Sequence, residues 1–486
     1  MRRLAEWAVL FGIAVLAGAG PGIATPALAA PPDEGECPAI SPRDAEGRPD
    51  TDATPLILKE GMQVGSEGLL ALKSLLPKEV WRHRESFFFE GMMMEIGPCH
   101  RRYPLPGFYK LATEQHAPGV SLDSKGNLVN YVAGIPFPQA SIDSESETAA
   151  TEWAWNLEKR FRGAGYAGRF RITDFPNRLG SVMRYEGKFF AFQAAGRSDL
   201  ASDDYRVPGT GDLLWATGGN FTSPFGAREL AWRQFRSIAS EGEWKKSDDI
   251  FVYVPSLRKS RRAATPWVDG AFMPRFSVAD QSQGGGSMAL GGGGSIRPGA
   301  GPSLAVTENA QAGLTGLYLR PNAYRWRLLG QQTVIAPING SRPGWPTVEG
   351  RNYGSSGLSV ASDRWDVRHA VVIEGLLLQS SETVRSVTLY IDYQTLQPLY
   401  WISRTAKRRL VEVGILVHQF SGDRPEEVRW PDDSPNRVFE PVAASFLNAL
   451  AGRGGWLRES HELKSLPFAP SAIKRMTTTD ALNRRH

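Results

Sequence analysis

The feature that most limits the fold of this chain is a series of strand-like segments joined by very short polar connectors. These segments are residues 367–377, 384–392, 399–404 and 410–420, and two of the connectors read QTLQP and AKRR. A parallel crossover needs a dozen or more residues, so connections of this length force neighbouring strands to run antiparallel. The sequence therefore predicts an antiparallel β-meander over residues 366–420.

Further strand patterns occur upstream, where polar and apolar residues alternate or short apolar runs appear. They cover residues 169–172, parts of 183–192, 250–254 and 324–328. Helices are expected at 69–76, which ends at Pro77, at 226–239, and at 441–451, where proline stands near the first turn and glycine follows the end. The chain is therefore predicted to be mainly β, of the α+β class.

The N-terminus has the pattern of a secretory signal. Residues 1–29 combine Arg2 and Arg3, an apolar run over 8–18, and a small-residue cleavage pattern at 27–29. The alternative is a membrane anchor, but the run is well short of the ~20 apolar residues that a spanning helix needs. We expect a cleaved signal, periplasmic export and no membrane span in the mature protein.

Composition divides the rest of the chain into four parts. Residues 30–54 read as an extended leader, 55–470 as a single domain, and 471–486 as a disordered basic tail. A glycine-rich insert at 284–302 interrupts the domain. A phosphate-binding loop is the alternative for these glycines, but neither GxxxxGK[ST] nor a strand–GxGxxG–helix pattern surrounds them.

The charge of the chain does not indicate a nucleic-acid partner. Lys and Arg number 56 against 51 for Asp and Glu, which gives a net charge of +5. The signal contributes +1 and the last 16 residues +3, so residues 30–470 carry only +1. A basic tail on a nearly neutral body is not the electrostatic footprint of a nucleic-acid-binding domain.

The two cysteines, Cys37 and Cys99, form an even pair in a chain expected to be exported. A disulfide is the expected outcome in an oxidising compartment. It would close a loop of about 60 residues, worth roughly 3–4 kcal/mol. The alternative is a reactive or metal-binding thiol, which lacks a CxxC spacing and has only His100 nearby.

No catalytic arrangement stands out. The seven histidines form neither HExxH nor HxH, and the segment GLSVA at 357–361 lacks the final glycine of a nucleophile elbow. Paired carboxylates, as in glycoside hydrolases, can be far apart in a sequence and stay an open alternative. We therefore predict no catalytic residues, no metal ligands and no cofactor. The 14 tryptophans belong mostly to the core, although a curved aromatic sheet can also enclose an apolar ligand.

Several ordered segments carry a family resemblance. They are GIPFP at 134–138, WAWN at 153–156, YVPSLRKSRRA at 253–263, YRWRLLG at 324–330, RW at 364–365 leading into VVIE at 371–374, and YIDY at 390–393. Together they span roughly residues 55–425 and resemble the exported bacterial DUF1329 family, which is grouped with the LolA/LolB outer-membrane lipoprotein carriers and receptors. The basic motif departs from the family, because Ser260 interrupts its run of arginines and the glycine-rich insert follows it.

This resemblance implies a large curved antiparallel sheet that forms an incomplete LolA/LolB-like barrel, with helices plugging the open side. It implies a periplasmic location in a diderm bacterium. Relatives with defined roles hold acyl chains in the concave face, whereas the DUF1329 family itself has no settled activity, so function transfers only by analogy of fold.

The predicted ligand site combines a basic turn with nearby aromatic residues. The strand at 250–254 leads into Arg258, Arg261 and Arg262, which at a cavity rim would pair with a phosphate or carboxylate head group. The candidate residues are Arg258, Arg261, Arg262, Tyr253, Trp326 and Trp365. The alternative for the arginines is a solvated turn.

Our leading hypothesis is a periplasmic carrier or chaperone for a lipid or other hydrophobic ligand, serving outer-membrane export with an envelope transport complex. One alternative is an envelope docking protein with a filled core, and another is a hydrolase or lyase acting on envelope substrates. A concave face packed by its own side chains favours docking, whereas converging carboxylates or a Ser–His pair favour an enzyme.

Overall fold

The computed structural model describes fifteen segments of the chain. These are residues 31–40, 55–175, 182–200, 204–255, 258–262, 270–272, 276–278, 288–290, 318–340, 352–379, 384–424, 428–430, 433–449, 455–465 and 467–482. The predicted signal lies outside the described residues, as do most of the predicted leader and of the glycine-rich insert. Among the described residues, no helix is long and apolar enough to cross a membrane.

One 15-stranded sheet dominates the fold, in the order β12-β11-β10-β9-β8-β7-β21-β20-β19-β18-β17-β16-β4-β3, with β15 also paired to β16. Its strands are β3 (Gln63–Val64), β4 (Met94–Cys99), β7 (Gly165–Phe175), β8 (Met183–Gln193), β9 (Leu213–Ser223), β10 (Ala231–Ser237), β11 (Asp249–Val254), β12 (Lys259–Arg262), β15 (Tyr324–Ala336), β16 (Arg364–Leu377), β17 (Ser386–Asp392), β18 (Pro398–Arg404), β19 (Leu410–Phe420), β20 (Phe439–Asn448) and β21 (Gly455–Lys464). Neighbours run antiparallel except β4, which lies parallel to β16. The predicted class, mainly β with a large curved antiparallel sheet, is confirmed.

The remaining elements are short. Three two-stranded sheets pair β1 (Ala39–Ile40) with β2 (Leu56–Ile57), β5 (Ser121–Leu122) with β6 (Leu128–Val129), and β13 (Phe276–Val278) with β14 (Met288–Leu290). The α-helices are α1 (Lys78–Arg82), α2 (Arg84–Phe87), α3 (Gly107–His116), α4 (Ala149–Lys159) and α5 (Pro470–Met476). The 3-10 helices are η1 (Ser66–Leu75), η2 (Ala117–Gly119), η3 (Gln139–Ser141), η4 (Phe225–Ala227), η5 (Ile238–Glu241), η8 (Pro321–Ala323), η9 (Ser421–Asp423) and η10 (Asp480–Leu482).

The predicted meander is present as β16, β17, β18 and β19, each antiparallel to the next. The helix expected at 69–76 is η1, which ends just before Pro77. Successive side chains of each strand point to opposite faces of the meander, and apolar residues occupy both faces. Ile373, Leu389 and Ile391 belong to one hydrophobic cluster, whereas Tyr390, one residue along, belongs to another.

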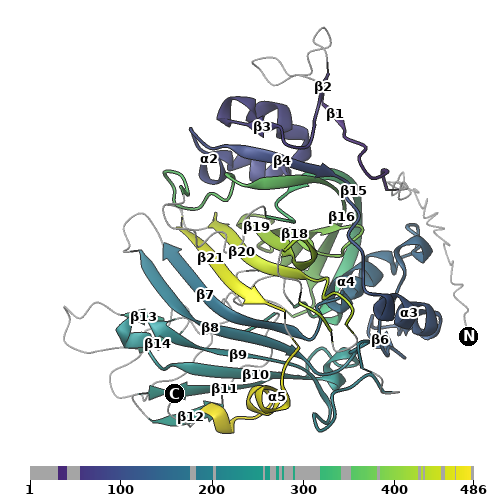
Figure 1. Ribbon diagram of the computed structural model, residues 1–486, viewed down its shortest axis with the longest axis vertical. Helices are drawn as coiled ribbons and strands as arrows, with labels where there is room; N and C mark the ends of the chain where they lie inside the picture. The colour runs from purple at the N-terminus through teal and green to yellow at the C-terminus, as the bar shows by residue number, and fades with distance from the viewer. Residues whose placement is uncertain are drawn as a thin grey trace, which may run out of the picture.

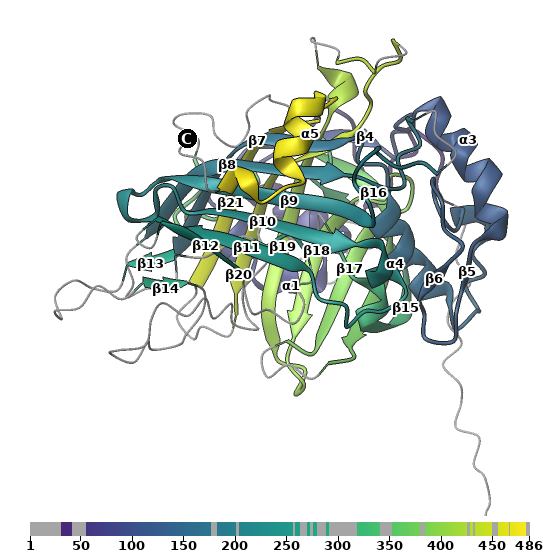
Figure 2. The ribbon, with the colours of Figure 1, turned by 90° about the horizontal axis from the view of Figure 1, so that it is seen from below.

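The sheet curls strongly, so that β8–β11 run crosswise to β17–β19 when the molecule is seen from below (Figure 2). We name its two faces by the helices that cover them. The α4 face carries α4, which packs against β15 and β16, and the α5 face carries α5, which packs against β8 and β9. The N-terminal elements lie beyond β16, at the top of Figure 1.

Large aromatic side chains fill the α4 face. Trp215 and Trp232 are fully buried there with Tyr166, and the ring of Tyr318 stacks on Trp215 at 4.2 Å between centroids. Trp153 of α4 is equally buried against β15, β16 and β17. These three tryptophans therefore belong to the core, as the sequence analysis predicts for most tryptophans of the chain.

Two predicted helices are strands. The first correction concerns residues 226–239, which form η4, β10 and the start of η5. Leu230, Phe235 and Ile238 match helical spacing, but β10 lies between β9 and β11 and alternates Trp232 on the α4 face with Phe235 on the other. Tertiary pairing overrides a short helical pattern here.

The second correction concerns 441–451, where β20 covers Phe439–Asn448 between β19 and β21. Pro441 lies opposite His418, next to a register shift in β19. Proline is tolerated in a sheet at such irregularities, so Pro441 stands at an irregular position of the strand and does not begin a helix.

The third correction concerns the tail, since 470–482 contain α5 and η10 in place of a disordered segment. Ala481 and Leu482 are buried, and Ile473 packs against the cluster around Phe192.

At the other end of the chain, Cys37 and Cys99 form a disulfide with a Cα–Cα distance of 5.2 Å. It ties the N-terminal segment to β4.

Candidate ligand-binding cleft

Strands β21, β7, β8, β9 and β10 lie side by side (Figure 1). Two adjoining pockets open on their α5 face. The first has a volume of about 300 Å³ and is lined by Arg169, Phe170, Arg171, Glu186, Gly187, Lys188, Thr222, Ser460 and Glu462. The second has a volume of about 390 Å³ and is lined by Ala167, Gly168, Arg169, Lys188, Phe189, Phe190, Gly219, Asn220, Ala231 and Arg233. Because both pockets use Arg169 and Lys188, we treat them as one site, the cationic cleft.

Strand register places the lining residues. One row of directly opposite residues crosses seven strands: Glu462, Arg169, Lys188, Asn220, Ala231, Tyr253 and Ser260. Side chains alternate between faces, and Phe170 and Phe189, each next to a member of the row, belong to the α4-face cluster. The row therefore projects from the α5 face, although its members are far apart in the sequence.

The next row along the strands carries the most unusual charge. Arg233 of β10 is only 8% exposed, and it lies opposite Gly218 of β9, which in turn lies opposite Phe190 of β8. A Cβ on Gly218 would stand 2.9 Å from both the Arg233 side chain and the Phe190 ring. The glycine thus leaves the space in which the guanidinium lies over that ring, 4.9 Å from its centroid.

Arg233 has few partners. One of its terminal nitrogens donates to the backbone oxygen of Trp232 at 2.8 Å, and Nε has no hydrogen-bond partner among the described residues. No described carboxylate forms an ion pair with it, and burial lowers the pKa of the guanidinium to about 10. A buried charge without a counterion is costly, which marks the position as a candidate functional one.

The neighbouring arginine of the same strand shows the usual solution. Arg236, on the α4 face, is 2% exposed and donates to both oxygens of Asp248, at 3.0 and 2.9 Å. Gln234 also donates to Asp248, at 2.7 Å. Thus β10 buries a paired arginine on one face and an arginine without a described carboxylate partner on the other.

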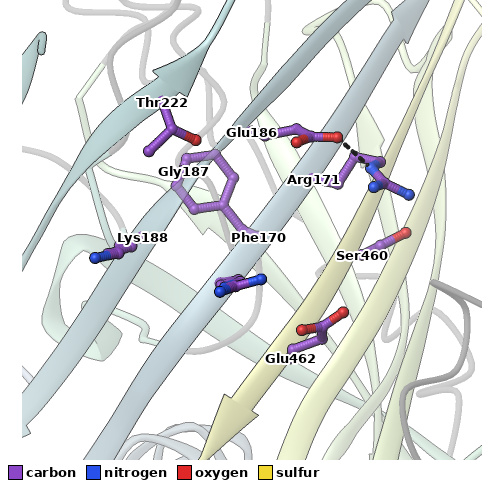
Figure 3. Close-up of a pocket in the computed structure, with 9 residues that line it drawn as sticks. Phe170, Arg171, Glu186, Gly187, Lys188, Thr222, Ser460 and Glu462 are labelled. Atoms are coloured by element: carbon purple, nitrogen blue, oxygen red, sulfur yellow. Dashed lines mark hydrogen bonds and ion pairs between the residues drawn. The ribbon is translucent and has the colours of Figure 1, made fainter. Parts of the chain in front are cut away.

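The rim of the cleft adds further charge. Arg171 and Glu186 form a half-exposed ion pair of 2.8 Å, drawn as a dashed line in Figure 3, where the ring of Phe170 lies beside Gly187. Arg169 and Lys188 are exposed and stand opposite each other on β7 and β8. Neither forms an ion pair with a described carboxylate, and like charges in directly opposite positions are unfavourable.

The side chains that line the cationic cleft suit the binding of a ligand. Alanine and phenylalanine surfaces lie next to three cationic groups, a combination that fits a molecule with an apolar part and an anionic part. Within the described segments, no group of three or more His, Cys, Asp or Glu side chains could hold a metal ion. The serine of the elbow-like segment, Ser359, is buried and donates its hydroxyl to the backbone oxygen of Phe87.

The six predicted ligand residues lie in three separate places. Tyr253 is half-buried on β11, opposite Ala231 and therefore next to the cleft. Arg258 is exposed and has a positive φ of 50°, whereas Arg261 and Arg262 are exposed on β12, which has β11 as its neighbour. Arg262 also forms an ion pair with Asp249.

The two predicted tryptophans are buried in different clusters. Trp326 of β15 donates its indole N–H to the backbone oxygen of Pro321 at 2.8 Å and packs with α4. Trp365 of β16 donates to Val360 at 3.3 Å, and its ring lies 5.9 Å from that of Phe88. The structure thus does not bring the predicted residues together in one cavity, and their ligand-binding role stays a prediction.

Sequence reasoning missed Arg233, Lys188 and Arg169 as site residues. Arg169 lies in a recognised alternating strand, but a charged residue in such a strand normally faces solvent. Arg233 was hidden because its segment was predicted to be a helix. The one available signal was the Gly218–Gly219 pair inside a strand, since glycine there often marks a close approach of other groups.

Comparisons with known proteins place the chain in context. Residues 83–286, which include α4 and the cleft strands β7, β8, β9 and β10, match the model of a family described as a protein of unknown function (DUF1329). The predicted family resemblance is thereby confirmed. No curated protein matches the chain.

Three solved structures are similar at low identity. A putative outer membrane lipoprotein-sorting protein domain from Vibrio parahaemolyticus is 10% identical, with coverage of 70% of this chain and 100% of that one and a TM-score of 0.37. A DUF1329 family protein from Desulfovibrio piger is 12% identical, with coverage of 68% and 96% and a TM-score of 0.36. A LolA superfamily protein from Nitrosomonas europaea is 14% identical, with coverage of 68% and 96% and a TM-score of 0.29.

Proposed function

We propose that this chain is a carrier or chaperone that binds a lipid or another hydrophobic ligand in the cell envelope. The observation that carries the proposal is the cationic cleft, in which apolar surface is accessible on the α5 face. Its second pocket, of about 390 Å³, lies in the size range of small-molecule sites, which is roughly 300–1,000 Å³.

The energetics of such a site are favourable on elementary grounds. Acyl surface that leaves water contributes roughly 25 cal/mol per Å², so about 200 Å² supplies on the order of 5 kcal/mol before the costs of association. The apolar residues that line the second pocket are Ala167, Phe190 and Ala231. A ligand would therefore gain most from its apolar part.

The periplasm is the compartment we propose. The signal pattern at residues 1–29 supports export, and the Cys37–Cys99 disulfide fits an oxidising compartment. The resemblance to exported DUF1329 proteins agrees with both. A role in outer-membrane export, with an envelope transport complex as partner, is the finer proposal.

Native mass spectrometry tests the carrier proposal. Protein purified from periplasm under mild conditions is expected to carry bound lipid-like masses, which organic extraction and lipid analysis then identify. A matched sample is stripped of lipid and offered total envelope lipids. Protein that emerges empty in both arms would contradict a carrier.

A second candidate is an envelope docking protein, and the α4 face favours it. Trp215, Trp232 and Tyr166 are fully buried there against the chain's own residues. A face packed in this way leaves a ligand little room, as expected for a docking protein with a filled core. Protein that stays empty of lipid, yet pulls down the same envelope protein after crosslinking in intact cells, would support docking over carriage.

A further inference from the structure

The charges of the cleft carry an inference about the kind of ligand. We propose that the cleft binds an anionic amphiphile, a long-chain molecule with a carboxylate or phosphate head, and that Arg233, Lys188 and Arg169 bind the head. This inference rests on the proposed carrier function and adds the chemical class and the residues. It also moves the head-group site away from the predicted turn at Arg258, Arg261 and Arg262.

The first support is the buried state of Arg233. Its side chain is about nine-tenths buried, lines the second pocket, and forms no ion pair with a described carboxylate. Removing a guanidinium from water without a counterion costs several kcal/mol. Arg236, three residues along the same strand, shows that this fold supplies a carboxylate where an arginine is needed for structure alone.

The second support is the way in which neighbouring residues hold Arg233. Gly218 leaves room for the side chain, and the Phe190 ring supports the guanidinium from one side at 4.9 Å. A cation held over an aromatic ring keeps its other donors free for an anion. One terminal nitrogen donates to the backbone oxygen of Trp232, and no described carboxylate pairs with the guanidinium, which lines the second pocket.

The third support is the pair of cations on the rim. Arg169 and Lys188 are direct cross-strand partners, and each lines both pockets. Two positive charges in this position repel each other. Glu462 lies opposite Arg169 on its other side, whereas Lys188 has Asn220 there, so an anion bound near Lys188 relieves the repulsion. With Arg233, they give the head group three cationic neighbours.

The fourth support is the apolar surface next to these cations. Phe190 and Ala231 line the same pocket as Arg233, so a chain attached to the head can lie over them. A free phosphate ion would use the cations but leave this surface unused. An uncharged lipid would use the surface but leave Arg233 without a counterion.

The experiment compares ligands that separate head from chain. Lipid-free full-length mature protein is titrated with palmitate, hexadecyl phosphate, methyl palmitate, acetate and inorganic phosphate, and binding is followed by isothermal titration calorimetry. Palmitate and hexadecyl phosphate are expected to bind roughly 10- to 100-fold more tightly than methyl palmitate. This is the gain in affinity that a hydrogen bond to a charged group typically provides. Acetate and inorganic phosphate are expected to bind more weakly still.

Variants then locate the head group. Arg233→Met should weaken palmitate binding by roughly tenfold or more while leaving methyl palmitate unchanged. Lys188→Gln, an exposed change that folding tolerates, should act in the same direction. Arg325→Met is the matched control, because Arg325 is exposed on β15, outside the cleft.

The possible outcomes separate the two proposals. Equal binding of palmitate and methyl palmitate, or unchanged palmitate binding by both cleft variants, would overturn the head-group assignment and leave the carrier proposal standing. Inorganic phosphate that binds as tightly as hexadecyl phosphate would indicate a free-anion site and overturn the amphiphile. No binding of any long-chain probe would count against the carrier proposal itself.

Discussion

At the scale of single residues, the buried carboxyl of Asp366 gives the clearest pH effect. It is 0% exposed, and Tyr103 donates to its Oδ2 at 2.8 Å, while Oδ1 has no hydrogen-bond partner among the described residues. Burial raises the pKa of Asp366 to about 6, against the opposing attraction of Arg364 and Arg368. In the unfolded chain the carboxyl returns to its ordinary pKa of about 3.9.

The sign of the effect follows from proton binding. Between about pH 4 and 6 the folded state binds more protons at Asp366 than the unfolded state, so this group lowers stability as pH rises. A shift of about two units corresponds to roughly 3 kcal/mol at neutral pH. Asp366→Asn is expected to remove this loss. The free energy of unfolding of the variant minus that of wild type should therefore be larger at pH 7.5 than at pH 4.5.

Urea unfolding at the two pH values measures the difference. The exposed Asp143→Asn is the control and should track wild type at both. Parallel pH curves for wild type and Asp366→Asn would show that the carboxyl ionises normally in the folded protein.

Single residues also mark the limit of sequence reasoning. The pairing of Cys37 with Cys99 could be predicted because an even cysteine pair in a chain expected to be exported favours a disulfide. The unusual states of Asp366 and Arg233 could not be predicted, because they depend on burial and on residues far away in the sequence, such as Tyr103 for Asp366 and Phe190 for Arg233. Strand register and the missing Cβ of Gly218 create the environment of Arg233, and neither can be read from the residues around it.

At the scale of elements, β9 makes room for the cleft through Gly218. A Cβ there would stand 2.5 Å from the backbone oxygen of Trp232 and 2.9 Å from Arg233 and Phe190. Gly218→Ala is therefore expected to lower the free energy of unfolding by roughly 1–3 kcal/mol. Gly107→Ala is the control, since nothing lies within 4 Å of a Cβ at that position.

Chemical denaturation of both glycine variants provides the measurement. The Gly218→Ala protein should also bind palmitate more weakly, because Arg233 must move. A Gly218→Ala protein as stable as wild type would mean that the neighbouring groups adjust freely.

The C-terminal elements α5 and η10 allow a second test. Leu482 is 3% exposed in the structure, although the sequence predicts a disordered tail around it. Leu482→Ala is expected to cost about 2 kcal/mol, the lower end for a buried leucine, because the site is near the chain end. Leu111→Ala, at a position 63% exposed, should cost far less.

Thermal and urea unfolding of the two leucine variants distinguish the cases. Equal effects at Leu482 and Leu111 would show that η10 is not docked in solution. The result also bears on the cleft, because α5 packs against β8 and β9, which line it.

The elements also show why part of the fold could be predicted. The meander was accessible because four long apolar segments have connectors too short for any other arrangement. Residues 226–239 and 441–451 are predicted as helices because a few apolar residues match both a helix and a strand that is buried on both faces. Their position in the middle of a sheet comes from pairing with segments far away in the chain.

At the scale of the whole molecule, the Cys37–Cys99 disulfide closes a loop with a sequence separation of 62. It joins the N-terminal segment to β4, where Gly35 also donates to the backbone oxygen of Cys99 at 2.9 Å. A double Cys37→Ala, Cys99→Ala variant is expected to lose roughly 4 kcal/mol of stability, since the open loop has more freedom when unfolded.

Unfolding with and without reductant tests this link. Reductant should destabilise wild type by the same amount and leave the double variant unaffected. If reductant has no effect on wild type, the cysteines are not joined in the purified protein.

The two margins of the large sheet have a consequence for self-association. Among the described strands, β12 pairs with β11 and β15 pairs with β16, so each has a second side without a described strand. Open margins can recruit strands from another copy and grow into aggregates. Exposed arginines occupy both, with Arg261 and Arg262 on β12 and Arg325 and Arg327 on β15. Arg262 pairs with Asp249 and Arg327 with Glu374, so Arg261 and Arg325 supply the positive charge that opposes the addition of a strand from a second copy at either margin.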